Sequence, residues 1–300
     1  MMKLRLILFL SLLFSTPTMA QKTDSKLQKL LEKEVENFRG DIGIYVKNLK
    51  TNKVAKINSD TIFSTASIVK VPILVGVFDK INNNQLQLNQ KFTYSEKQVY
   101  GGSGLMQFFK DSSETDLSTM VSLMLSYSDN VASLWCQDLA GGGKEINVLM
   151  EKLGFAHTKV NSRTLGRESD WKKYGWGQTT PEEMARLFIL IRQQQLLTPQ
   201  LDDKMYRFLK NQFYNGRSLS QIPSTINAID KTGSVDASRG EVILVNAPSG
   251  DYVFCILTDN NQDKSWGNTN EAEVLTRKIS NLLWNYFEPK NQFTPFQVVE

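Results

Sequence analysis

A serine and a lysine three residues apart are the first side chains in this sequence whose types and spacing could do chemistry. Ser67 and Lys70 stand at the beginning of an apolar run, Val71 to Phe78, and Ser64-Thr65 just before them can cap a helix. Residues three apart lie on one face of a helix, so Lys70 would lie one turn from the Ser67 hydroxyl. A serine hydroxyl is a poor nucleophile without a nearby base, and a lysine of lowered pKa can supply one.

The scarcity of other catalytic side chains favours the lysine. His157 is the only histidine, which leaves little room for a Ser-His-Asp triad or a zinc site. The two cysteines, Cys136 and Cys255, lie in apolar segments of different elements, and we expect them to be buried and unpaired. A second Ser-x-x-Lys, from Ser169 to Lys172, lies in a polar segment and lacks this helical context.

Two further polar motifs follow along the chain. Ser128-Asp129-Asn130 interrupts a helical pattern, and by itself it could be an ordinary turn between two helices. Lys231-Thr232-Gly233 continues a strand-like segment, and by itself it could be a polar stretch of an edge strand. Gly233 would let a substrate approach the backbone closely.

Together the three motifs resemble a known signature. Ser-x-x-Lys, Ser-Asp-Asn and Lys-Thr-Gly, in this order, mark class A β-lactamases and penicillin-binding proteins. Residues 63–72, 126–132 and 238–240 also look like the corresponding stretches of class A enzymes. The resemblance covers nearly the whole chain after residue 20. It implies an α/β (α+β) fold, in which an antiparallel sheet flanked by helices stands beside an all-helical lobe.

The resemblance also implies catalytic roles in an acyl-enzyme route. Ser67 would attack the amide carbonyl and Lys70 would take its proton. The backbone N–H groups of Ser67 and Ser234 would hold the oxyanion. Ser128 would pass a proton to the leaving nitrogen, and Asn130 would hold the substrate amide.

The carboxylate of the substrate would be received at the third motif and just beyond it. The resemblance gives this role to Lys231, Thr232 and Arg239, and Lys231 also counts among the catalytic residues. Gly233 and Ser234 complete the expected substrate-binding set.

One part of the class A pattern is missing. Those enzymes carry a glutamate after the second motif and an asparagine four residues later, which position the deacylating water. Here the glutamate position falls near Thr164 or Leu165, Glu168 is the only glutamate nearby, and Lys172 stands in place of the asparagine. We expect Glu168 to be a surface charge rather than the deacylation base. The sequence therefore supports acylation better than fast deacylation.

These observations favour a class A-like serine β-lactamase that opens β-lactam rings through an acyl-enzyme on Ser67. A D-Ala-D-Ala peptidase or related serine hydrolase is the first alternative, and a non-catalytic β-lactam receptor is the second. The substrate would be a small β-lactam or a peptidoglycan-like molecule. We expect a monomer without cofactor or metal, and nothing in the charge pattern points to nucleic acid.

The first twenty residues have the pattern of a secretory signal peptide. Lys3 and Arg5 precede an apolar run from Leu6 to Phe14, and small residues lead to a cleavage site at Ala20-Gln21. No cysteine follows that could carry a lipid anchor. We therefore expect a secreted protein, in the periplasm or outside the cell, without a membrane anchor.

Hydrophobic periodicity predicts the elements that must position the motifs. Helices are expected over residues 25–38, 68–81, 117–126, 131–139, 145–153, 181–196 and 270–287. Strands are expected over residues 42–48, 53–57, 226–230, 240–246 and 251–258, and 161–178 is expected to be a long ordered loop. Residues 21–300 would form one catalytic domain, with an α/β lobe from about 24–62 and 205–290 and a helical lobe from about 63–204.

Overall fold

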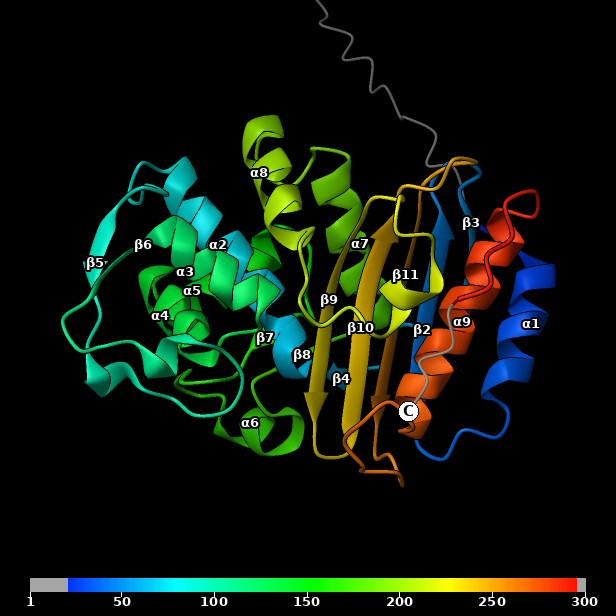
Figure 1. Ribbon diagram of the computed structural model, residues 1–300, viewed down its shortest axis with the longest axis horizontal. Coiled ribbons are helices and arrows are strands. Elements are labelled where there is room, and N and C mark those ends of the chain that lie inside the picture. Colours follow the sequence, from blue (N-terminus) through cyan, green and yellow to red (C-terminus); the bar gives the residue numbers. More distant parts are fainter. Residues whose placement is uncertain (1–20, 296–300) are drawn as a thin grey trace, which may run out of the picture.

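The computed structural model describes residues 21–295 and is built around a six-stranded sheet (Figure 1). The strand order is β1-β3-β2-β11-β10-β9, and all neighbours are antiparallel except β1 and β3. The strands are β1 (Lys22–Thr23), β2 (Asp41–Asn48), β3 (Lys53–Ile57), β9 (Ala228–Val235), β10 (Ser238–Val245) and β11 (Tyr252–Asp259). The third motif lies on β9, at the edge of the sheet that faces the rest of the molecule.

Two terminal helices cover one face of the sheet. These are α1 (Ser25–Val35) and α9 (Glu271–Phe287), which lie side by side in Figure 1. Their apolar stripes, including Leu31 and Leu283, pack with inward residues of the sheet such as Ile243 in one buried cluster. This layer brings the two ends of the described chain together on the same side of the sheet.

The helical part of the molecule packs against the other face. Helix α7 (Pro181–Arg192) lies directly on β2, β10 and β11. Beyond it lie α2 (Lys70–Asn82), α3 (Leu117–Ser126), α4 (Asn130–Leu139), α5 (Gly142–Lys152) and α8 (Pro199–Leu209). Helix α2 is buried at nine consecutive residues, from Lys70 to Phe78, which is expected of a helix that is apolar all round.

Short elements connect these layers. A small sheet is made of β4 (Phe63–Ser64), β8 (Gly177–Thr179) and β7 (Lys159–Val160), and a hairpin-like pair is made of β5 (Lys91–Thr93) and β6 (Glu114–Asp116). Helix α6 (Glu168–Tyr174) lies between β7 and β8. Single 3₁₀ turns are η1 (Ala66–Val69), η2 (Glu96–Gln98), η3 (Met106–Phe108) and η4 (Ser218–Gln221).

The predicted fold class is confirmed, with corrections to single elements. The segment expected to be a loop, 161–178, contains α6 and the beginning of β8. Helix α7 ends at Arg192 instead of 196, because Gln194 takes a left-handed conformation with φ 58°. Helix α8 was not predicted, and the lobe boundary expected near residue 205 falls inside it.

The cysteine prediction is confirmed, because Cys136 and Cys255 are both buried and free. The expected signal peptide, residues 1–20, lies outside the described residues. None of the helices between residues 21 and 295 is long and apolar enough to cross a membrane.

Candidate active site

Ser67 is held in a tight turn between β4 and α2. It lies in η1, directly after Ala66, whose φ of 43° places it in the left-handed region. Strand β9 packs closely on this turn. A Cβ added to Gly233 would lie 2.4 Å from the Thr65 carbonyl oxygen and 3.1 Å from the Ser67 nitrogen. Gly233 is therefore needed to bring the third motif beside the serine.

Lys70 lies one helical turn further and is fully buried. Its Nζ is 3.0 Å from Ser67 Oγ, 2.6 Å from the Ser128 carbonyl oxygen and 2.9 Å from Asn130 Oδ1. The Asn130 amide is oriented by its Nδ2, which donates to the Gly101 carbonyl, so Oδ1 must accept. A neutral lysine has two N–H groups, and these two acceptors use both. The remaining lone pair is then free to accept the Ser67 proton.

The surroundings of Lys70 favour this neutral form. Burial holds the pKa of Lys70 well below its usual range, and the positive charge of Lys231 lowers the pKa further. Asp129 acts in the opposite direction but does not outweigh them. The two sequence-predicted residues Ser67 and Lys70 are thus brought within hydrogen-bond distance of each other.

The second motif lies at the break between α3 and α4. Ser128 has a φ of 53°, and its Oγ is 3.1 Å from Lys70 Nζ and 3.3 Å from Lys231 Nζ. One hydroxyl therefore connects both lysines. The left-handed conformation at this position turns the hydroxyl inward instead of continuing the helix.

Asp129, the middle residue of the second motif, has a structural role that the sequence did not reveal. It caps α4 by accepting from the Ala132 N–H at 2.9 Å, and it also accepts from Leu105 N at 2.6 Å and Met106 N at 2.7 Å. These bonds hold the 101–108 segment against the motif. The same segment supplies one rim of the cleft described below.

Lys231 is fully buried, like Lys70. Its Nζ donates to the Thr232 carbonyl oxygen at 3.0 Å in addition to its contact with Ser128. Burial lowers its pKa to about 8, and the charge of Arg217 acts in the same direction, whereas Asp230 next to it acts against the shift. Lys231 therefore remains mainly cationic at neutral pH, while Lys70 is disposed to be neutral.

A cleft of about 740 Å³ opens above these residues. Its walls come from the turn of Ser67, the 101–108 segment, the second and third motifs and the segment before α9. It is lined by Ser67, Gly102, Ser103, Ser128, Asn130, Tyr214, Gly216, Arg217, Thr232, Gly233, Ser234, Trp266, Gly267, Asn268 and Glu273. All predicted site residues except Glu168 and Arg239 lie in this cleft or, for Lys70 and Lys231, directly beneath it.

Arg239 does not reach the cleft, which corrects the sequence prediction. Its side chain is buried, and its Nη1 donates to the carbonyls of Asp236 and Ser238 at 2.9 Å each. Its Nη2 donates to the Ser265 carbonyl at 2.8 Å, and its guanidinium lies over the Trp266 ring. Carbonyls of the β9–β10 turn and of Ser265 thus hold the two Nη groups of this guanidinium.

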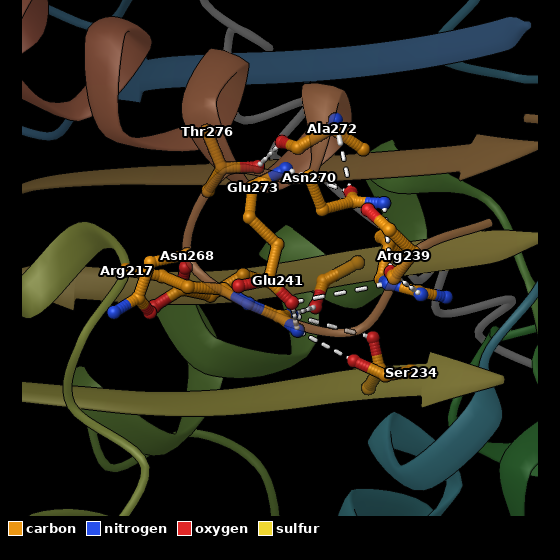
Figure 2. A network of polar contacts seen from close by, with 12 residues as sticks. Arg217, Ser234, Arg239, Glu241, Asn268, Asn270, Ala272, Glu273 and Thr276 are labelled. Atoms are coloured by element: carbon orange, nitrogen blue, oxygen red, sulfur yellow. Dashed lines mark hydrogen bonds and ion pairs between the residues drawn. The ribbon is translucent and has the colours of Figure 1, made fainter. Parts of the chain in front are cut away.

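Arg217, which the sequence did not single out, lines the cleft in its place. Its Nη2 donates to Ser234 Oγ and, at 2.7 Å, to Glu273 Oε1. Its Nη1 donates to the carbonyls of Gly233 and Gly240 at 3.4 and 3.1 Å. Figure 2 shows the Glu273 carboxylate approached by the guanidinium groups of both Arg217 and Arg239.

Glu168 lies on the surface at the beginning of α6. It is exposed and accepts from the Gly166 N–H at 3.1 Å. The backbone N–H groups of Glu168 and Gly166 hold the pKa of its carboxyl below the usual range. Lys70 has no carboxylate among its hydrogen-bond partners in the described chain.

The sequence is similar to those of known β-lactamases. Residues 22–287 match the model described as the "Beta-lactamase enzyme family". Beta-lactamase VEB-1 of Pseudomonas aeruginosa is 22% identical over 94% of this chain and 97% of its own length. Beta-lactamase SME-1 of Serratia marcescens is 24% identical over 73% of this chain and 74% of its own.

Solved structures with the same fold are equally distant in sequence. PBP-A superposes with a TM-score of 0.79 at 23% identity, covering 90% of this chain and 98% of its own. A β-lactamase from Sphaerobacter thermophilus DSM 20745 superposes with a TM-score of 0.77 at 21% identity, covering 90% and 99%.

Proposed function

Because the chain belongs to the β-lactamase enzyme family, we propose that it is a serine hydrolase that opens β-lactam rings through an acyl-enzyme on Ser67. The observation that carries the proposal is the buried Lys70. Its two N–H groups are committed to fixed acceptors, and its lone pair is left for the Ser67 hydroxyl 3.0 Å away. This arrangement is an activated nucleophile without histidine.

Acylation follows from these contacts. Neutral Lys70 takes the Ser67 proton as Oγ attacks the lactam carbonyl, and the backbone N–H groups of Ser67 and Ser234 are the proposed donors to the oxyanion. Ser128 then gives its hydroxyl proton to the leaving nitrogen and recovers a proton from Lys70, 3.1 Å away. The C–N bond breaks, the ring opens, and Lys70 returns to its neutral form.

The other end of the cleft is suited to a carboxylate. Arg217 uses its four Nη hydrogens on protein acceptors, so it acts mainly through its charge and through Ser234. The Ser234 hydroxyl accepts from Arg217, which leaves its own hydrogen free to donate to a ligand. Lys231 and Thr232 lie next to it on β9. We assign the carboxylate to these groups, and the substrate amide to Asn130.

The cellular setting is a further part of the proposal. The basic, apolar and small-residue order of residues 1–20 supports export to the periplasm or beyond. As a separate part of the proposal, residues 21–300 form one catalytic domain that acts as a monomer. An activity against cell-wall antibiotics would be useful there.

Covalent labelling tests the function directly. A fluorescent penicillin followed by peptide mapping is expected to label the peptide that contains Ser67. Ser67→Ala should remove the label, while Ser169→Ala, which alters the second Ser-x-x-Lys, should keep it. Full labelling of Ser67→Ala would refute the assignment.

A specific observation favours a second candidate, a D-Ala-D-Ala peptidase. Glu273 is the only carboxylate that lines the cleft in the described structure, and it is already paired with Arg217. Acylation therefore has a base, but the water of deacylation has no carboxylate of its own. Stopped-flow measurements with a chromogenic cephalosporin separate the possibilities. Steady turnover supports the β-lactamase. Slow release together with activity on D-Ala-D-Ala peptides supports the peptidase, and a stalled stoichiometric burst indicates a receptor.

A further inference from the structure

A second cavity, open to solvent at the surface, lies beside the reaction centre, separate from the cleft. It has a volume of about 230 Å³ and is lined by Tyr100, Leu134, Ser162, Arg163, Trp171 and Trp176. Tyr100, Arg163 and Trp171 are exposed, so the cavity is filled by solvent water. Ser162 and Arg163 provide polar groups in a wall that is otherwise mainly aromatic.

Trp176 is the residue that this cavity shares with the catalytic lysine. Its ring centroid lies 5.8 Å from Lys70 Nζ, and Lys70 itself does not line the cavity. The indole is therefore the side chain that borders both the lysine and the cavity. Tyr100 packs edge-on against the same indole, with the ring centroids 5.3 Å apart and an interplanar angle of 79°.

The backbone around Trp176 fixes this wall in place. The Trp176 carbonyl accepts from Asn161 N at 2.8 Å and from Ser162 N at 3.0 Å. The next residue, Gly177, lies so close to η1 that an added Cβ would be 2.5 Å from Val69 Cγ2. The indole is thus attached to a segment packed tightly on the turn that carries Ser67.

We propose that Trp176 keeps the water of this cavity away from Lys70 and the Ser67 ester, and that it thereby sets the lifetime of the acyl-enzyme. This inference rests on the proposed acyl-enzyme function. Trp176 is a positioning residue, because it acts by excluding the second reactant. The proposal accounts for a lysine that is fully buried although its aromatic neighbour lines a cavity open to solvent.

The step that Trp176 limits is hydrolysis of the ester. Water attacks the acyl carbonyl and gives one proton to neutral Lys70. The tetrahedral intermediate then releases Ser67 Oγ, which takes that proton back from Lys70, and the product leaves as a carboxylic acid that ionises in solvent. No additional reactant is needed. Because the bound acyl group occupies the cleft beside Ser67, access of water from the side of Trp176 decides the rate.

Trp176→Ala tests the inference in the full-length protein. Benzylpenicillin is mixed with the enzyme, and intact-protein mass spectrometry follows the formation and loss of the adduct. We expect adduct loss to accelerate by roughly tenfold or more, the lower part of the range for general-base catalysis. Adduct formation should stay unchanged, because acylation does not use water. A merely structural disturbance would slow both steps and would not accelerate adduct loss alone.

Two further variants complete the test. Trp176→Phe keeps a smaller ring in the wall and should give an intermediate lifetime, so it decides the matter by itself if Trp176→Ala does not fold. Trp171→Ala removes another indole from the cavity, one that has no contact with Lys70, and should leave the lifetime unchanged. An unchanged lifetime in the Trp176 variants overturns the inference. Failure of the parent protein to form any adduct overturns the proposed function instead.

Discussion

Replacing Arg217 with alanine should weaken substrates that carry a free carboxylate. The side chain is largely buried, with 12% of its surface exposed, and it faces the cleft beside Ser234. Its removal deletes a positive charge and releases the Ser234 hydroxyl from the orientation that leaves its hydrogen free. Arg239→Ala deletes an equal charge nearby, but from a guanidinium that is committed to backbone carbonyls.

The magnitude follows from the one ligand contact that Arg217 supports. A hydrogen bond to a charged group contributes about 1.5–3 kcal/mol, and each 1.4 kcal/mol is about a factor of ten, so kcat/KM should fall by roughly 10- to 150-fold. The loss should be near the upper end at low ionic strength and smaller at high salt, because part of it comes from long-range charge. Esterified substrates lack the carboxylate and should change by less than about threefold.

The assay compares kcat/KM for a free-acid β-lactam and its ester in three variants. Arg217→Ala should affect the acid selectively. Arg239→Ala should lower the melting temperature and affect acid and ester by the same factor. Arg207→Ala removes a charge from an exposed side chain on α8 and should change neither. A selective loss in Arg239→Ala, or equal losses for acid and ester in Arg217→Ala, would refute the assignment to Arg217.

Three other outcomes are expected from the same geometry. Lys70→Ala should slow acylation by at least the roughly 10²-fold typical of losing a general base, measured as adduct formation; a near-normal rate in the folded variant would show that another group activates Ser67. The acylation rate should rise with pH through the lowered pKa of Lys70, because Lys70 must be neutral to take the Ser67 proton. The rate should fall above pH 8, because burial lowers the pKa of Lys231 to about 8 and its charge is lost there. A profile still rising at pH 9 would contradict the role of the Lys231 charge. Glu168→Gln should change neither formation nor loss of the adduct, because the side chain is exposed; an adduct trapped only in this variant would make Glu168 the deacylation base.

Most of the fold could be predicted because its elements repeat apolar residues with a clear period. Helix α8 was missed although Leu201, Met205 and Leu209 are spaced by four residues, and although Thr198 caps the helix with Pro199 behind it. The pattern was therefore present in the sequence. Helix α6 could not be found in this way, because none of its seven residues is buried and no apolar stripe marks it.

The motif residues could be predicted because each motif carries its own local context. Arg217 has no such context, since it lies in an irregular segment just before η4. Tertiary contacts place it at the cleft: η4 packs against α9, and the Arg217 side chain donates to carbonyls of β9 and β10. The position predicted for Arg239 was wrong for the opposite reason. Its neighbours in sequence resemble a binding stretch, but the carbonyls of the turn compete for its guanidinium, and sequence does not show which acceptor prevails.

We expect the charges around the two lysines to favour acylation over release. A carboxylate next to Lys70 would raise its pKa and keep it protonated, so it could not take the Ser67 proton in the first step. Within residues 21–295 the partners of Lys70 are hydroxyl, carbonyl and amide oxygens, and Lys231 acts to keep Lys70 neutral.

The arrangement that frees Lys70 for acylation therefore leaves no second base for the water, and the same lysine must serve both steps. With Trp176 excluding water from the other side of the site, as proposed above, hydrolysis of the ester should be slower than its formation and should limit kcat. A burst of ring opening, equal to the enzyme concentration and followed by a slower steady rate, is the expected kinetic signature. Its absence at saturating substrate would show that release is served by a group other than Lys70.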